Sequence, residues 1–252
     1  MATLEVKRVF KTFEGLKSDR FYVLDDVDFK ISENEFICII GKSGCGKSTL
    51  LNLIAGFTKP DNGEILLDGK AIEGPSAEKG VVFQEHGLFP WRTVKQNVAF
   101  GLKLAKRKDA DQRADYFVDL VGLTDYKDKY PSSLSGGMAQ RVGIARALAT
   151  DPKLLLMDEP LGALDAMTRE KMRVEILDIW QKKKKTIIFV THSVPEAVYL
   201  ADRVILLKDG QVKLDQHIEL KRPRQVRTEA FQNYVHELEQ LLTDCDDNVF
   251  SE

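Results

Sequence analysis

The sequence has few cysteines, no long apolar run and no excess of charge of one sign. Its three cysteines, Cys38, Cys45 and Cys245, form no C-x-x-C pair. We therefore expect reduced thiols that neither bind a metal nor have a structural role. No apolar stretch approaches the roughly 20 residues needed to span a bilayer, and the first residues lack the basic start and apolar middle of a secretory signal. These absences predict a soluble, cytosolic chain.

The balance of charges argues against a nucleic-acid-binding protein. Charged residues make up 30% of the chain, yet the formal net charge is only −2, so no global field attracts the protein to a polyanion. The sequence shows no internal repeat and no low-complexity linker. Its 252 residues suffice for one large α/β domain with a smaller subdomain.

A glycine-rich turn at residues 41–48 fits the pattern G-x-x-x-x-G-K-[ST] at every fixed position. Its glycines permit backbone angles that a Cβ atom would forbid, so successive N–H groups can converge on one anion. Lys47 adds a charge for the β- and γ-phosphates, and the Ser48 hydroxyl can hold Mg²⁺. We predict that a nucleotide is bound by Gly41, Lys42, Ser43, Gly44, Cys45, Gly46, Lys47, Ser48 and Thr49.

The segments flanking this turn support that prediction. Residues 36–40 form a continuous apolar run, typical of a strand buried on both faces of a parallel sheet. After the turn, leucine and isoleucine recur at helical spacing over residues 50–54. The phosphates would therefore lie at a helix N-terminus, where the helix dipole favours anions.

Three further apolar runs predict strands that deliver polar side chains at their ends, namely residues 80–83, 154–157 and 186–190. Gln84 follows the first run. It could line a site at the edge of the sheet or, equally, be a solvated loop amide. Asp158 and Glu159 follow the second, and suit the orientation of Mg²⁺ through water and the polarisation of an attacking water. His192 follows the third, so we predict a catalytic or γ-phosphate-sensing role rather than a purely structural one.

The region before the phosphate turn predicts an antiparallel β layer. Residues 4–6 and 22–31 cluster or alternate in hydrophobicity and are separated by turn residues. Phe13 lies at the end of the first of these strands. Its ring could stack on an adenine face, but the residues alone favour a plain strand aromatic.

Residues 93–130 predict helices, which we interpret as an inserted helical subdomain. The segment before them, residues 87–91, places two aromatic side chains around a proline and is more apolar than a surface loop needs. Either a partner protein or the core of the subdomain could cover it.

Ser135, followed by Gly136 and Gly137, is predicted to cap the N-terminus of a second helix suited to binding an anion, with Gln140 near its start. One chain rarely needs two such helix ends for one nucleotide. The second helix end therefore suggests a nucleotide held by another subunit.

Two further helices are predicted in the C-terminal third. Ser193 and Glu196 match a capping box, with Pro195 in the first turn of its helix. Residues 228–242 predict an amphipathic helix that packs on its own domain rather than on a partner. The lysines at 182–185 complement a helix dipole and do not indicate a nucleic-acid site.

From about Leu4 to Leu214 the chain resembles the ATPase subunit of ATP-binding-cassette (ABC) transporters. The resemblance rests on the phosphate turn followed in order by Gln84, Leu134, Ser135, Gly136, Gly137, Asp158, Glu159, Asp165 and His192. It implies a P-loop NTPase fold of the α/β class, with a RecA-like core of mostly parallel sheet, an antiparallel β subdomain and an α-helical subdomain over about residues 88–150. The ATPase domain would span residues 1–225, followed by a C-terminal helix and polar tail over 226–252.

The resemblance also implies a role for each site residue. Phe13 would stack on the adenine of ATP, and Asp165 would cross a dimer interface. The catalytic group would comprise Glu159 as general base with His192, Gln84 and Lys47. Mg²⁺ would be held by Ser48, Gln84 and, through water, Asp158. The signature residues would close on the nucleotide of the opposite subunit; they are Ser135, Gly136, Gly137 and Gln140.

Within this family, several segments resemble the importers of nitrate, sulfonates and taurine. These segments are residues 88–91, 97–102, 162–169 and 195–204. Ala139, Leu161 and Ser193 depart from the residues usual in that branch, and none of the three departures removes a catalytic group.

We therefore predict an ATP-hydrolysing importer subunit that works as a head-to-tail dimer and drives transport of a small solute of the nitrate, sulfonate or taurine type. Expected partners are a second copy or a homologous ATPase subunit, an integral-membrane permease and a solute-binding protein, and no nucleic acid. The expected location is the cytoplasm, on the inner face of the cell membrane.

The alternative is a soluble ABC ATPase in an assembly or repair complex without a permease. Repair types need a long coiled-coil insertion between the phosphate turn and the signature, and this interval holds one modest helical insert. An assembly complex stays open. A small-molecule kinase, the third class, would not explain Ser135, Gly136 and Gly137.

Overall fold

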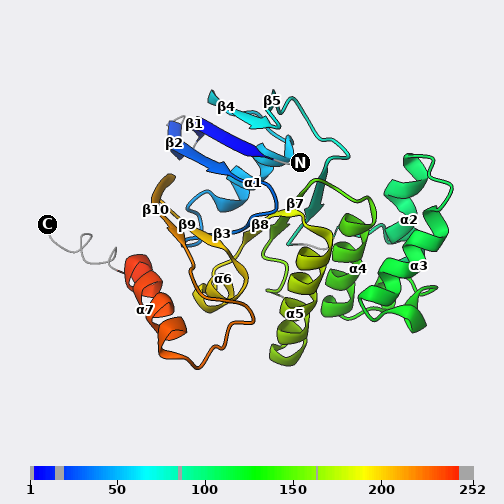
Figure 1. Ribbon diagram of the computed structural model, residues 1–252. Coiled ribbons are helices and arrows are strands. Elements are labelled where there is room, and N and C mark those ends of the chain that lie inside the picture. The colour runs from blue at the N-terminus through cyan, green and yellow to red at the C-terminus, as the bar shows by residue number, and fades with distance from the viewer. Residues whose placement is uncertain (1–2, 15–19, 85–86, 163, 244–252) are drawn as a thin grey trace, which may run out of the picture.

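Two sheets form the framework of the protein (Figure 1). The computed structural model describes residues 3–14, 20–84, 87–162 and 164–243. The smaller sheet is antiparallel, with the strand order β2-β1-β4-β5. Its strands are β1 (Leu4–Glu14), β2 (Arg20–Ile31), β4 (Asn62–Leu67) and β5 (Lys70–Ala71). The predicted antiparallel layer is confirmed, with longer strands than the sequence indicated.

The larger sheet has the strand order β10-β9-β3-β8-β7-β6. The strands from β9 to β6 run parallel and β10 pairs antiparallel with β9. Their bounds are β3 (Phe36–Ile40), β6 (Lys79–Val82), β7 (Leu154–Asp158), β8 (Thr186–Val190), β9 (Arg203–Lys208) and β10 (Gln211–His217). Because the parallel strands end at one edge, the polar residues that follow them converge there.

The side chains of β3 alternate between two apolar cores. Phe36, Cys38 and Ile40 pack with the helices on one side of the large sheet. Ile37 and Ile39 pack with α1 (Lys47–Ala55) and the antiparallel sheet on the other. Helix α1 therefore lies between the two sheets (Figure 1). This layering explains the continuous apolar run of β3, since both of its faces are buried.

Helices cover the other face of the large sheet and extend beyond its β6 edge. Their bounds are α2 (Val94–Leu104), α3 (Ala110–Leu120), α4 (Gly136–Ala149), α5 (Ala166–Lys183), α6 (Val194–Leu200) and α7 (Glu229–Thr243). Helices α2 and α3 lie at the end of the molecule opposite α7 (Figure 1). One apolar core continues from them through α4 to the sheet, so a separate subdomain over residues 88–150 stays a prediction.

The C-terminal helix packs on its own domain, as predicted. Phe231, Val235 and Leu238 of α7 are buried in the core on the helix-covered side of the large sheet. The segment before α7 is fastened by the buried guanidinium of Arg224, which donates to the carbonyl oxygens of Val198, Ala201, Ile218 and Leu220. Burial lowers the pKa of Arg224 to about 10.

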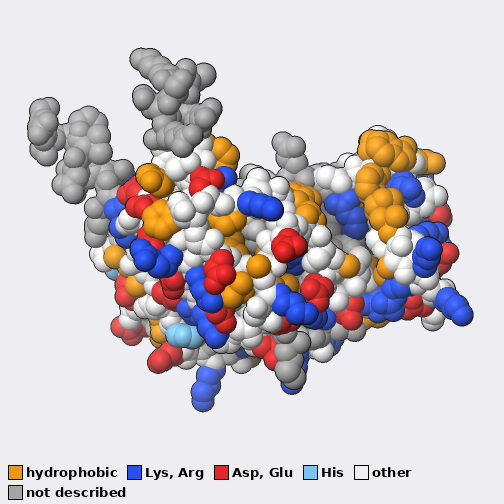
Figure 2. Space-filling model, turned by 90° about the horizontal axis from the view of Figure 1, so that it is seen from above, with side chains coloured by type: hydrophobic (Ala, Val, Ile, Leu, Met, Phe, Trp, Pro, Cys, Tyr) orange, Lys and Arg blue, Asp and Glu red, His pale blue; other side chains and the backbone are white. Residues whose placement is uncertain are grey.

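Among the described residues, no helix has the length and apolarity to cross a bilayer. Cys38 is buried, Cys45 is partly buried, and both are free thiols; Cys245 lies outside the described residues. Apolar side chains gather at the end of the molecule that carries α2 and α3 (Figure 2).

Candidate functional site

The phosphate turn joins the end of β3 to the start of α1. Gly44 and Gly46 have φ angles of 82° and 101°, in the left-handed region that glycine adopts without steric cost. A Cβ atom on Gly46 would lie 2.6 Å from the carbonyl oxygen of Val23, so β2 packs too closely for any side chain. The first backbone N–H groups of α1, which have no partner within the helix, therefore lie at this turn.

The Lys47 side chain is folded back onto the turn. It is 7% exposed, and its Nζ donates to the carbonyl oxygens of Gly41 and Lys42, both at 2.8 Å. A buried ammonium group requires such partners. Phosphate oxygens would be stronger hydrogen-bond acceptors for the Lys47 ammonium group than these carbonyl oxygens, because they carry negative charge.

One cavity of about 370 Å³ joins the phosphate turn to three strand ends. It is lined by Val23, Ser43, Gly44, Gly46, Lys47, Ser48, Thr49, Gln84, Glu159 and His192. Gln84 follows β6, Glu159 follows β7 and His192 follows β8. The structure therefore brings together the side chains that the sequence assigned to the edge of the parallel sheet.

Glu159 is the centre of this cavity's polar contacts. Its Oε2 lies 3.2 Å from Nδ1 of His192 and 3.4 Å from Nε2 of Gln84. Its backbone N–H donates to the Val190 carbonyl at 3.0 Å. Its φ of 43° lies in the left-handed region, which costs a residue with a Cβ roughly 1–2 kcal/mol. Such strain is characteristic of functional positions, where the surrounding contacts fix the side chain.

Asp158 lies one residue before Glu159, close to the phosphate turn. Its Oδ1 is buried without a hydrogen-bond partner among the described residues, and the Ser48 hydroxyl bonds the carboxylate. Burial is the main cause that raises the pKa of Asp158, and the nearby charge of Glu159 acts in the same direction. A buried carboxylate oxygen next to a hydroxyl fits the hard oxygen ligands that Mg²⁺ prefers.

The described residues contain no cluster of three or more His, Cys, Asp or Glu side chains that could hold a metal ion. Mg²⁺ is commonly held by one or two protein groups together with substrate phosphates and water, and Ser48 and Asp158 fit that arrangement.

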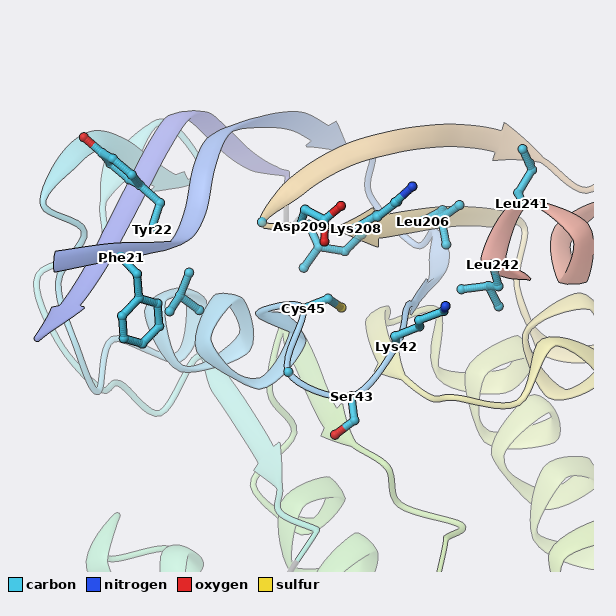
Figure 3. Close-up of a pocket in the computed structure, with 14 residues that line it drawn as sticks. Phe21, Tyr22, Lys42, Ser43, Cys45, Leu206, Lys208, Asp209, Leu241 and Leu242 are labelled. Atoms are coloured by element: carbon cyan, nitrogen blue, oxygen red, sulfur yellow. The ribbon is translucent and has the colours of Figure 1, made fainter. Parts of the chain in front are cut away.

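A second cavity, of about 530 Å³, adjoins the phosphate turn (Figure 3). Val23, Ser43 and Gly44 line both cavities. The ring of Phe21 points to the side of β2 that faces the turn, whereas the ring of Tyr22 points to the opposite side (Figure 3). Both residues line the cavity, and Phe21 is the one whose ring points toward the turn (Figure 3).

Phe13, the predicted adenine platform, lines neither of these two cavities. It pairs directly with Phe21 across β1 and β2, so both side chains lie on one face of the sheet. The ring of Phe13 is approached by Lys11 Nζ, which lies 5.7 Å from its centroid. Phe21 and Val23 were not predicted from the sequence, and the pairing of β2 with β1 is irregular at Val23.

The signature residues lie at a separate cavity of about 260 Å³. Ser135 caps α4, and its Oγ accepts a hydrogen bond from the Met138 N–H at 3.3 Å, as predicted. The cavity is lined by Ser135, Gly136, Gly137, Met138, Arg141, Leu164, Asp165 and Thr168. It shares no residue with the cavity that contains Lys47 and Glu159. Within one chain, the two predicted phosphate-binding helix ends therefore do not meet.

Two other predicted residues of this region differ in their environment. Asp165 caps α5: its Oδ1 accepts a hydrogen bond from the Thr168 N–H at 3.0 Å. This contact is the main cause that lowers the pKa of Asp165. Gln140 is 1% exposed and lies on α4 outside the residues that line the signature cavity.

The predicted capping box at the start of α6 is wrong. Ser193 occupies the N-cap position without a side-chain cap bond, although Pro195 does lie in the first turn. The Glu196 carboxylate instead accepts a hydrogen bond from the Thr191 hydroxyl at 2.6 Å. A residue pattern cannot distinguish the two outcomes, because a buried hydroxyl in the preceding turn competes for the same carboxylate.

Comparisons with known proteins agree with this geometry. The ABC transporter family profile matches residues 24–162. The chain is 49% identical to an uncharacterized ABC transporter ATP-binding protein of Methanocaldococcus jannaschii, over 96% of this chain and 91% of that protein. It is 48% identical to a taurine import ATP-binding protein of Roseobacter denitrificans (82% and 78% covered), and 45% identical to a nitrate import ATP-binding protein of a Synechocystis strain (92% and 87% covered).

The fold is also similar to a solved ATP-binding cassette. That structure is a dimer in a post-hydrolysis state bound to ADP and inorganic phosphate. Its TM-score is 0.79 at 33% sequence identity, over 86% of this chain and the whole of that chain.

Proposed function

The chain belongs to the ABC transporter family as an ATP-hydrolysing subunit of the importer type, and on this premise we propose how its residues bind and cleave ATP. The observation that carries the proposal is the position of Glu159. Its carboxylate contacts His192 and Gln84 in the same cavity as Lys47 and Ser48. A carboxylate held there is suited to accept a proton from water that attacks a terminal phosphate.

In this proposal the phosphates of ATP lie on the turn between β3 and α1. The N–H groups of the turn bind their oxygens, and the Lys47 ammonium exchanges the Gly41 and Lys42 carbonyls for the β- and γ-phosphates. Ser48, Gln84 and, through water, Asp158 would hold Mg²⁺, which neutralises phosphate charge when it is bound. His192 would donate to the γ-phosphate while its contact with Glu159 orients the base.

The separate signature cavity supports a composite site made by two chains. Ser135 and Gly137 lie at a helix end suited to an anion, yet their cavity shares no residue with that of Lys47. In a head-to-tail pair, the Ser135 helix of one copy would cover the ATP bound by the other. Asp165, exposed at the start of α5, would then lie at the contact between the copies.

We also propose that the chain acts on the cytoplasmic face of a membrane, bound to a permease. Among the relatives are taurine and nitrate import proteins, so a small oxyanion or sulfonate is the proposed cargo, delivered by a solute-binding protein. The segment before α2 supports a protein contact, because Trp91 is 69% exposed and apolar side chains gather at that end of the molecule (Figure 2). These relatives do not favour a soluble assembly or repair complex.

The assigned base is tested with Glu159→Gln, which keeps the shape of the side chain but cannot accept the proton. We expect this variant to bind ATP and to dimerise in its presence, while the steady-state hydrolysis rate falls by about 100-fold or more. Glu239→Gln, at an exposed position on α7, is the control and should hydrolyse ATP at the normal rate. Unchanged hydrolysis by Glu159→Gln would exclude Glu159 as the base.

A further inference from the structure

The Glu196 carboxylate is a buried ionisable group that the proposed chemistry does not use. Glu196 is 5% exposed and lies in the first turn of α6, where it makes no capping bond. Its Oε2 accepts a hydrogen bond from Thr191 Oγ1 at 2.6 Å. A carboxylate is costly to bury without compensating contacts, and helix capping does not supply them here.

The Thr191 hydroxyl forms hydrogen bonds that link Thr191, the residue before His192, to Ser193, the residue after it, and to Glu196. It donates to Glu196 and accepts from the backbone N–H of Ser193 at 3.1 Å. The Thr191 backbone N–H donates to the Ile39 carbonyl at 3.2 Å, which continues the pairing of β8 with β3. The residue before His192 is therefore anchored to the sheet, and the residue after it is anchored to the Thr191 side chain.

The His192 side chain itself has little to hold it in place. It is 67% exposed, and within the described part of the chain its ring contacts the Glu159 carboxylate at 3.2 Å. The direction in which its ring points is therefore set mainly by the backbone of the Thr191–Ser193 turn. A small displacement of a catalytic group can cost a large factor in rate, so the anchor of this turn matters for the reaction.

Cations on α5 explain how the Glu196 carboxylate is accommodated in the interior. Burial raises the pKa of Glu196, and the Thr191 hydroxyl, Arg173 and Arg169 oppose that effect. Arg169 also donates to the carbonyl oxygens of Leu161 and Leu164, at 3.2 and 2.9 Å. Arg169, whose charge acts on Glu196, thus also holds the chain segment between Glu159 and Asp165.

We propose that Glu196 is a positioning residue for ATP hydrolysis: through the Thr191 hydroxyl it fixes the turn that presents His192 to Glu159 and to the γ-phosphate. This inference rests on the proposed role of His192. Glu196 does not touch the nucleotide, so its removal should slow the chemical step without weakening ATP binding.

The test compares Thr191→Val, Thr191→Ser and Glu196→Gln. Thr191→Val keeps the volume of the side chain but lacks the hydroxyl, and we expect kcat to fall about tenfold with the KM for ATP unchanged. Thr191→Ser should restore most of the rate because it keeps the hydroxyl. Glu196→Gln should lower kcat less than Thr191→Val, because its amide oxygen can still accept the bond. Glu175→Gln, which neutralises a partly buried carboxylate on α5 away from this turn, should leave kcat unchanged.

A double-mutant cycle separates positioning from a general loss of structure. If Glu196 and Thr191 act through the histidine, Thr191→Val should cause no further loss of kcat in a His192→Ala background. Equal losses in both backgrounds would overturn the proposal. If His192→Ala is slow but Thr191→Val hydrolyses ATP at the wild-type rate, the positioning role of Glu196 is overturned and the role of His192 stands. If His192→Ala itself hydrolyses ATP at the wild-type rate, the role of His192 and the inference are overturned together. Thermal unfolding and ATP-dependent dimerisation of each variant verify that it is folded.

Discussion

Phe21 and Tyr22 are adjacent on β2, but their rings lie on opposite sides of the strand (Figure 3). Only Phe21 faces the phosphate turn, and Val23 on the same side belongs to both cavities there. Tyr22 instead contacts Phe10 in an edge-on arrangement with ring centroids 6.3 Å apart. The base of a nucleotide that leaves the phosphate turn past Val23 would thus meet Phe21.

We therefore expect Phe21→Ala to raise the KM for ATP about fivefold or more, since a base stacked on an aromatic ring is worth roughly 1–3 kcal/mol. The kcat should stay constant because stacking is equal in the ground and transition states. Tyr22→Ala is the matched control, and steady-state kinetics provide the measurement. Phe13→Ala, measured in parallel, shows how much the ring paired with Phe21 contributes to the KM for ATP. Equal KM values for Phe21→Ala and Tyr22→Ala would refute the assignment.

At the scale of elements, Asp61 connects the loop after α1 to strand β1. Its carboxylate accepts hydrogen bonds from Lys11 Nζ at 2.7 Å and from the Thr12 N–H and hydroxyl at 2.7 and 2.8 Å. Chiefly through Lys11, and then through Thr12, the pKa of Asp61 is lowered from 3.8 to about 2. The end of the loop between α1 and β4 is thereby fastened to β1.

The lowered pKa of Asp61 gives a pH-dependent contribution to stability. Because the folded-state pKa lies below the unfolded one, the stabilisation is fully present above about pH 4 and is lost as the pH falls toward 2. We expect Asp61→Asn to lower the free energy of unfolding at pH 7 by about 1 kcal/mol, allowing for the partial exposure of the pair. Urea titrations at pH 7, 5, 4 and 3 measure the difference in the free energy of unfolding between the variant and the wild type. This difference, the stability gap, should narrow below pH 4. A constant gap would contradict the assignment.

Helix boundaries illustrate what an element's sequence can and cannot specify. Ser135 was predicted to cap α4 and does so, because its hydroxyl accepts a hydrogen bond from a free N–H group of the first helical turn. The capping box predicted at Ser193 and Glu196 is absent, because the Glu196 carboxylate accepts a hydrogen bond from Thr191, the residue directly after β8. The box at Thr93 and Gln96 of α2 was not predicted, although both reciprocal bonds are present.

At the scale of the whole molecule, the separation of the two helix ends predicts a site shared between chains. A Lys47→Ala chain and a Ser135→Ala chain should each be nearly inactive alone. When the two are mixed, the mixed dimer contains one intact composite site, so the rate should recover to about a quarter of the wild type if the two sites work independently.

The control for this experiment mixes Lys47→Ala with a chain that carries both substitutions, in which no intact site can form. Steady-state ATPase rates provide the measurement, and differently tagged chains verify that mixed dimers are present. Recovery in the first mixture alone supports the shared site. Equal rates in the two mixtures, with mixed dimers present, would show that each chain completes its own site.

Residue types and their spacing were enough to predict the chemistry of the phosphate turn and the positions of the buried strands along the chain. Gly44 and Gly46 occur where a left-handed backbone is needed, and a run such as residues 36–40 is apolar because both faces of β3 are buried. These features are local, so periodicity and residue type reveal them. The convergence of Gln84, Glu159 and His192 could also be expected, since parallel strands end at one edge.

The arrangement of strands and helices in space establishes which side chains meet across elements. It places Phe21 rather than Phe13 at the cavity beside the phosphate turn and keeps the Ser135 and Lys47 cavities apart. These outcomes depend on strand register and on the packing of helices against the sheet, which bring together residues far apart in the chain. A linear pattern contains the partners of such contacts but not the distances between them.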